Sequence, residues 1–203
     1  MTMRPSILAA LAAFLTAAAA HAADLTVVVR TADGQPVRDA VVTVKAPGGA
    51  GPVTFPWPYA VAQKDIRFNP FVLIVPVGAE VAFPNQDAVR HHVYSFSPVK
   101  KFELKLYGRE EARTVRFDKP GIVPLGCNIH DRMLAYVVVV DTPFAAKTGP
   151  DGTAVLKGLP ALAGSAVVWH PFMIAPKNQQ TVPVSASGRQ AVTVALRPAP
   201  PQP

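Results

Sequence analysis

Cysteine is the residue that this sequence has least of, since its 203 residues include only Cys127. A single cysteine excludes an intramolecular disulfide framework, and covalent haem attachment is excluded because no Cys-x-x-Cys-His motif is present. Charged residues make up only 16% of the chain and are scattered along it. Because they form no basic tract with interleaved aromatics, we expect no nucleic-acid partner, despite the net charge of +7.

The first 22 residues have the composition of an export signal. Arg4 supplies a positive charge, residues 7–20 are apolar and rich in Ala and Leu, and residues 20–22 (Ala-His-Ala) form a small-x-small cleavage site. The apolar run is shorter than the roughly 20 residues that a membrane-spanning helix needs. We therefore expect an exported, periplasmic protein whose mature chain begins near Ala23 and contains no transmembrane segment.

Long amphipathic helical patterns are absent, whereas Val-rich runs and turn residues recur along the chain, which has 22 prolines. Strands are predicted at residues 25–30, 40–45, 72–75, 80–83, 91–96, 102–106, 112–117, 122–125, 134–140, 153–156, 166–169 and 191–196. Short strands separated by turns at this spacing predict an all-β protein built from β-sandwiches.

The lone cysteine lies in a segment that also holds two other potential metal ligands. Cys127, His130 and Met133 fall within seven residues, between two predicted strands, where a tight loop can direct their side chains to one point. Thiolate and thioether are soft ligands and imidazole is borderline, so this set favours copper over hard cations. Zinc would prefer a closed tetrahedron without a thioether. Inert burial of Cys127 or an intermolecular disulfide are the alternative roles.

One Cys, two His and a weak axial Met form the usual copper site for electron transfer, so a second histidine is required. The mature chain offers His91, His92 and His170 besides His130. Successive residues of a strand point to opposite faces, so one of His91 and His92 faces the loop and the other faces away. His170 lies in a later block of the sequence, and a structural or surface role is expected for it.

Residues 60–142 resemble the plastocyanin and amicyanin family of blue copper proteins, the cupredoxins. The stretch Phe-Pro-Asn-Gln-Asp-Ala-Val-Arg-His-His-Val at residues 83–93 is similar to the family's segment that leads to its first ligand. Aligned without gaps, that ligand falls on His91. The two residues between His130 and Met133 match the amicyanin spacing. The sequence departs from the family at His92, where Asn is usual, and at Gly126, where an aromatic is common.

The resemblance implies a Greek-key β-sandwich with one type 1 copper site that transfers single electrons. By this alignment His91, Cys127 and His130 are the strong ligands and Met133 is the weak axial ligand. A redox protein is the implied partner, such as a cytochrome or a dehydrogenase. The basic charge of the chain favours an acidic one.

The flanking segments resemble a carboxypeptidase regulatory-like β-sandwich, in turn and strand pattern. Residues 24–48 look like its first half and residues 143–197 like its second half, and each flank alone is too small to bury a core. We therefore expect a discontinuous domain, with the copper-binding block inserted between its halves. Residues 46–52 read as a linker, and residues 198–203 as a Pro-rich tail.

A periplasmic electron carrier is the leading functional interpretation. The alternatives are a copper-binding or delivery protein on the same fold, and an interaction module without a redox role. We do not expect an enzyme. The sequence shows no Ser, His and Asp set, no paired carboxylates and no glycine-rich phosphate loop, and few histidines remain beyond one copper site.

Overall fold

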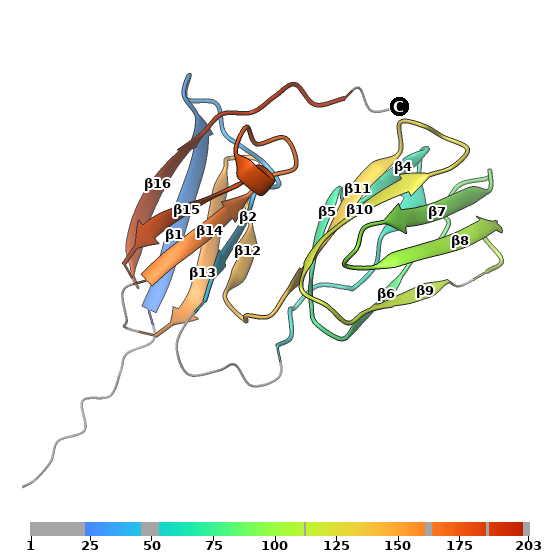
Figure 1. Ribbon diagram of the computed structural model, residues 1–203, viewed down its shortest axis with the longest axis horizontal. Helices are drawn as coiled ribbons and strands as arrows, with labels where there is room; N and C mark the ends of the chain where they lie inside the picture. The colour runs from blue at the N-terminus through green and yellow to red at the C-terminus, as the bar shows by residue number, and fades with distance from the viewer. Residues whose placement is uncertain (1–22, 46–52, 112, 161–163, 186, 201–203) are drawn as a thin grey trace, which may run out of the picture.

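The computed structural model describes residues 23–45, 53–111, 113–160, 164–185 and 187–200. In these ranges the chain forms two β-sandwiches that lie side by side (Figure 1). The predicted signal peptide at residues 1–22, the predicted linker at 46–52 and the last three residues of the Pro-rich tail lie outside the described residues. No helix of the described part is long and apolar enough to cross a membrane.

The smaller sandwich combines strands from both ends of the chain. Its three-stranded sheet has the order β13 (Thr153–Leu159), β1 (Ala23–Thr31) and β16 (Gly188–Val194). Its four-stranded sheet has the order β12 (Ala145–Lys147), β2 (Val41–Val44), β14 (Gly164–Trp169) and β15 (Gln179–Val184), the last preceded by a 3₁₀ turn, η1 (Pro176–Asn178). Alternate residues of the two sheets, such as Val27, Val42 and Leu156, meet in a common core.

The larger sandwich comes from the middle of the chain. Its five-stranded sheet has the order β5 (Val72–Pro76), β11 (Leu134–Val140), β10 (Gly121–Cys127), β7 (His91–Phe96) and β8 (Lys101–Tyr107). Two pairs complete it, β6 (Ala79–Ala82) with β9 (Thr114–Phe117), and β3 (Ala62–Lys64) with β4 (Arg67–Asn69). Strand β11 runs parallel to β5, whereas β10 is antiparallel to both of its neighbours. Val81, Phe117 and Val137 are fully buried between these sheets.

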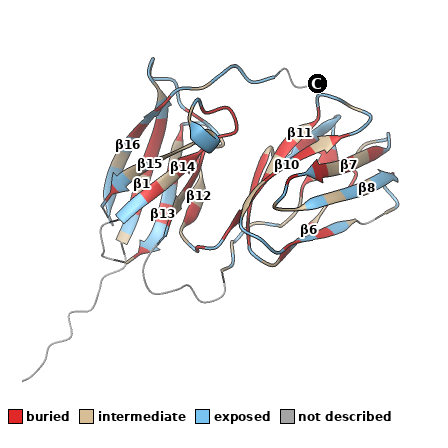
Figure 2. Cartoon of the chain, in the orientation of Figure 1, coloured by how far each residue is buried: buried red, intermediate tan, exposed pale blue. Residues whose placement is uncertain are grey.

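The two sandwiches share a third apolar cluster at their junction. Val138 and Ile74 of the five-stranded sheet are buried there with Trp169 of β14, and the Trp169 ring meets the Tyr136 ring edge-on at 5.5 Å. Lys147 Nζ also donates to the Val72 carbonyl oxygen at 2.8 Å. The flank sandwich therefore covers the part of the outer face of the five-stranded sheet formed by β5 and β11. Figure 2 shows these strands largely buried and β8 largely exposed.

The expected fold class is confirmed: the protein is all-β, with a cupredoxin-like sandwich and a smaller sandwich formed from the two flanks. The strands that sequence analysis missed are β3, β4, β12 and β15, which are short or, in β15, interrupted by Pro183. The limits of the domains and the carboxypeptidase regulatory-like identity of the flanks stay predictions.

Candidate metal centre

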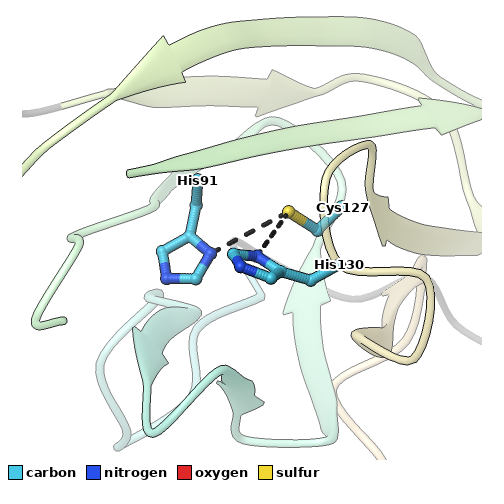
Figure 3. A group of neighbouring side chains, drawn as sticks. All are labelled: His91, Cys127 and His130. Carbon is cyan, nitrogen blue, oxygen red and sulfur yellow. Dashed lines mark hydrogen bonds between the residues drawn. The ribbon is translucent and has the colours of Figure 1, made fainter. Parts of the chain in front are cut away.

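A histidine from the start of β7 meets two side chains from the segment between β10 and β11. Cys127 Sγ lies 3.9 Å from His91 Nδ1 and 3.5 Å from His130 Nδ1 (Figure 3). Among the residues that the structure describes, these three form the one group of His, Cys or acidic side chains whose ligand atoms all lie within 4.8 Å of one another. Cys127 and His91 are buried, and His130 is half-buried. The structure thus brings together three of the four predicted ligands.

The fourth predicted ligand, Met133, is buried beside this group. Its side chain belongs to the same core cluster as Cys127, and both residues line one hollow at the end of the sandwich. The Met133 amide donates to the His130 carbonyl oxygen at 2.9 Å, which closes the ligand loop into a tight turn. A second bond, from the Asn128 amide to the His92 carbonyl oxygen at 3.1 Å, attaches the loop to β7. The loop is therefore held by backbone bonds on both sides of His130.

The neighbouring histidines of β7 point in opposite directions, as strand alternation requires. His91 faces the core and Cys127, whereas His92 faces outward and its Nε2 lies 2.8 Å from Glu103 Oε1 on β8. Sequence analysis left His91 and His92 as alternatives from strand geometry alone. The structure places His91 with the other ligands and His92 on the opposite face of the sheet.

Asp87 fixes the orientation of the His91 ring. Its Oδ2 lies 2.8 Å from His91 Nε2. Burial lowers the pKa of His91 and the bond to Asp87 only partly offsets this, so the ring is neutral near pH 7. A carboxylate can only accept a hydrogen bond, so Nε2 carries the proton and Nδ1 keeps its lone pair, directed toward Cys127 Sγ. This is the arrangement expected behind a metal-binding histidine.

Asp87 is itself held by the chain around it. Its carboxylate accepts hydrogen bonds from the backbone amides of Asp65, at 2.6 Å, and Ile66, at 3.1 Å, in the turn between β3 and β4. Both turn residues have φ of 55°, which aims successive amides at one acceptor. Burial raises the pKa of Asp87, but the bonds from His91 and from these amides outweigh it, so that pKa lies below its usual value. The carboxylate stays ionised as a fixed acceptor.

Sequence analysis did not identify Asp87, although it precedes His91 by only four residues. An acidic residue in the loop before a candidate ligand histidine is the sequence feature that could have identified it. Such a residue can contact the histidine only if the loop folds back on itself, and Asn85 stabilises that fold here. Asn85 Oδ1 accepts from the Asp87 amide at 2.8 Å, and its Nδ2 donates to the Val89 carbonyl oxygen at 2.8 Å. These bonds form an Asx-type turn that directs Asp87 toward His91.

The remaining histidine, His170, is remote from this group and belongs to the flank sandwich. It is buried, its Nδ1 accepts from the Phe172 amide at 3.3 Å, and its ring meets the Phe172 ring edge-on. Burial lowers the pKa of His170 to about 4. A neutral, hydrogen-bonded ring within a packed loop is structural, which agrees with the role expected from the sequence.

The donor set fits a copper ion. It consists of one thiol, two imidazole nitrogens that already face each other and the thiol, and a neighbouring buried thioether. Soft sulfur with imidazole suits copper, and no acidic side chain joins the described three-residue group, as a hard cation would require. The partner of His91 and the two backbone bonds of the loop hold the ligands near one another before any metal binds.

No protein-family model matches the chain, and no curated protein matches it. Among solved structures, a reduced Cu(I) form of a mutant amicyanin is 26% identical over 50% of this chain and 99% of that chain, with a TM-score of 0.38. A purple cupredoxin from Nitrosopumilus maritimus is 19% identical over 40% of this chain and 98% of its own, with a TM-score of 0.37. A copper-containing nitrite reductase from Thermus scotoductus SA-01 is 27% identical over 49% of this chain but only 25% of the reductase, with a TM-score of 0.40.

The sandwich that holds the candidate metal centre has a cupredoxin-like fold. In this sandwich a five-stranded sheet packs against two strand pairs, and the candidate ligands Cys127 and His130 lie at or just after the end of β10.

Proposed function

We propose that this chain is an exported type 1 copper protein that holds one copper ion and transfers single electrons between protein partners. The observation that carries the proposal is the convergence of His91, Cys127 and His130 at the end of one sandwich. These residues come from segments that are 36 positions apart in sequence, yet their ligand atoms lie within 4.8 Å of one another. Core packing alone gives no reason for such a group.

Each ligand has a distinct part in the proposed site. Cys127 offers a buried thiolate, and His91 offers the nitrogen that Asp87 leaves unprotonated. The buried Met133 would supply a weakly binding thioether. His130 is half-buried and lies next to Ile129, which is 49% exposed, so it is the ligand nearest to solvent and to an approaching partner. These residues would hold a copper ion, which would supply one-electron redox chemistry, and their fixed positions would keep the rearrangement of the site small.

The place of action and the partners follow from the sequence. An N-terminal export signal and a lone, buried cysteine suit an oxidising compartment, and we propose the periplasm. The net charge of +7 favours an acidic redox partner, such as a cytochrome or a dehydrogenase. We propose no enzymatic activity, because the candidate centre uses two of the four histidines of the mature chain, His91 and His130, and the other two lie apart from it, His92 against Glu103 and His170 in the flank sandwich.

Copper titration followed by a chelator challenge tests this function. We expect the protein to bind one equivalent of copper, to become intensely coloured as Cu(II), to cycle reversibly with one-electron reagents and to keep its metal in the presence of a competing chelator. A colourless Cu(I) protein that quickly loses its copper to the chelator would instead indicate metal delivery. A protein that binds no copper would contradict both functions and leave an interaction module.

A further inference from the structure

The start of the Pro-rich tail crosses from the flank sandwich to the end of the larger sandwich that holds the candidate metal centre. Figure 1 shows this segment leaving β16 and running toward the loop between β10 and β11. Its last described residue, Pro200, lines a hollow of about 480 Å³ whose wall also includes Cys127 and Met133. The two ends of the chain's second half thus meet beside the proposed ligands.

The residue before the tail is fixed to the flank sandwich by several hydrogen bonds. The Arg197 amide donates to the Phe172 carbonyl oxygen at 2.9 Å, and its guanidinium donates to the Pro171 carbonyl oxygen at 2.6 Å. The same guanidinium donates to the Met173 carbonyl oxygen at 3.3 Å. The tail therefore begins at a fixed point, and its first residue, Pro198, has little freedom of direction.

This fixed point rests on the outer face of the five-stranded sheet, close to the hollow. The Phe172 ring stacks on the Phe71 ring at 6.1 Å, and Phe71 meets the Tyr136 ring of β11 edge-on at 5.6 Å. Leu134, which also lines the hollow, lies two residues before Tyr136 on the same face of β11, or about 7 Å away. Residues 198–200 span about 9 Å in a polyproline II conformation, which is long enough to reach it.

The hollow has an apolar floor because a glycine lies between two larger side chains. Gly126 of β10 is the register partner of Tyr94 on β7 and of Leu134 on β11. A Cβ atom on Gly126 would lie 2.8 Å from Tyr94 Cζ and 2.9 Å from its hydroxyl oxygen, closer than real contacts allow. The Tyr94 ring therefore lies over the glycine, beside the Leu134 side chain. Aromatic-lined grooves of this kind bind proline-rich segments.

The composition of the tail suits this hollow. Residues 198–203 read Pro-Ala-Pro-Pro-Gln-Pro and carry no charged side chain. The charged side chains that line the hollow are the exposed Asp131 and Arg132, which have opposite signs, so the rim favours a neutral occupant as much as a charged one. A proline-rich segment is stiff and loses little conformational entropy when it binds. Its attachment at Arg197 also gives it an effective concentration on the order of millimolar.

We propose that this hollow is a binding groove for a proline-rich segment and that the chain's own tail occupies it through Pro200. The bound tail ties the flank sandwich to the end of the larger sandwich that holds the metal centre. It also covers the hollow that reaches Cys127 and Met133, and so limits the approach of solutes from that side. Binding of the tail requires no copper, and only its effect on a bound metal rests on the proposed function.

NMR of the metal-free, isotope-labelled full chain tests this contact directly. We expect nuclear Overhauser effects between Pro200 and the side chains of the hollow, such as Leu134, and we expect them to persist at high salt because the tail is uncharged. Ending the chain after Arg197 should shift the amide signals of Tyr94, Gly126 and Leu134. Shifts confined to residues near the cut would overturn the proposal. Overhauser effects between differently labelled copies would show that a second copy supplies the tail and would overturn binding within one chain.

A matched pair of substitutions in the full chain separates the contact of Pro200 from the stiffness of the tail. Pro200→Ser removes the ring that lines the hollow, whereas Pro198→Ser makes the same change at a tail residue that does not line it. Pro200→Ser should move the amide signals of Tyr94 and Leu134 most of the way to their positions in the truncated chain. Pro198→Ser should leave them close to those of the unsubstituted protein. Equal movement in both variants would contradict a site for Pro200.

The covering role of the tail is measured by the alkylation of Cys127 in metal-free protein. Cys127 is the only cysteine, so mass spectrometry after addition of iodoacetamide reports its reaction alone. Pro200→Ser should react several-fold faster than the unsubstituted protein, and Pro198→Ser should react at the unsubstituted rate. Equal rates in all three proteins would overturn the covering role. A protein that binds no copper but shows these differences would indicate failure of the proposed function alone, whereas a copper-binding protein without them would indicate failure of the tail proposal alone.

Discussion

The two faces of β7 differ in every property that matters for function. The inner face presents His91, Val93 and Ser95, which are at most 1% exposed and lie in or beside the core. The outer face presents His92, Tyr94 and Phe96, which are half-buried or exposed. Strand alternation alone separates them, since successive side chains point to opposite faces. A shift of one residue in register would place the face that carries the candidate metal centre in solvent.

The paired histidines show most clearly what this difference means. Both rings have a carboxylate within 2.8 Å of Nε2, yet Asp87 is enclosed by backbone amides and Glu103 lies on the surface with its side chain 57% exposed. The first contact orients the proposed ligand His91, and the second is an exposed surface contact of small energetic value. Identical residues one position apart therefore have different roles because of what the neighbouring strands place opposite them.

The largest expected difference between the faces is in copper affinity. His91→Ala should reduce copper affinity by at least about 100-fold, because it removes a proposed ligand. Removing even a hydrogen-bond partner of a metal ligand typically lowers metal affinity about 10–100-fold. His92→Ala should leave affinity within about twofold. Competition with a chelator of known affinity measures both. Equal losses in the two variants would contradict the assignment of His91.

The second-largest difference is expected between the carboxylates that contact the two histidines, in their effect on copper affinity. Asp87→Asn keeps the size of the side chain but removes the charged acceptor behind His91, and we expect copper affinity to fall about 10–100-fold. Glu103→Gln, the matched change on the outer face, should leave the affinity unchanged. If Asp87→Asn bound copper as tightly as the unsubstituted protein, the ring of His91 would not depend on this bond.

Substitutions on the two faces of β7 should also differ in how much they lower the free energy of unfolding. Val93→Ala removes buried methyl groups from a fully enclosed position and should lower the free energy of unfolding by about 2 kcal/mol. Phe96→Ala on the outer face should cost less than about 1 kcal/mol, from the lost contacts of its ring with Tyr94 and Lys101. Urea unfolding of metal-free protein measures the difference, and similar costs would show that the outer face is packed in solution.

The smallest effect is expected at Gly126, the residue of β10 that pairs with Tyr94 of β7. Gly126→Ala should destabilise the protein by about 1 kcal/mol, because its Cβ would displace the Tyr94 ring, which can swing toward solvent. Adding Tyr94→Ala should make the Gly126→Ala change nearly neutral, and a double-mutant cycle measures that coupling. Strict additivity of the two changes would mean that the ring does not rest on Gly126.

The sequence predicted much of this architecture because its strongest patterns are local. Alternation in residues 91–96 and the apolar runs at 122–125 and 134–140 correspond to β7, β10 and β11, and these strands position the ligand loop. The C-x2-H-x2-M spacing identified three candidate ligands, and the resemblance to the family assigned His91. Short strands such as β3 and β12 lack enough residues for a periodic pattern.

What the sequence could not supply are contacts that depend on the tertiary fold. The role of Asp87 requires the turn at Asp65 and Ile66 to approach a loop more than 20 residues later. Likewise, the contact between Tyr94 and Gly126 exists only once β7 and β10 pair in this register. The bond that Trp57 Nε1 donates to the Ile74 carbonyl oxygen, at the junction of the sandwiches, also joins segments that no local pattern connects.

The central claim is that Cys127 binds copper as a thiolate together with His91 and His130. The most direct measurement is the combined visible absorption and EPR spectrum of copper-loaded protein, recorded beside that of Cys127→Ser. We expect an intense thiolate-to-copper absorption band with the narrow copper hyperfine splitting of a type 1 site, and the loss of that band in Cys127→Ser. A band that persists in copper-loaded Cys127→Ser, or its absence from the unsubstituted Cu(II) protein, would contradict the account.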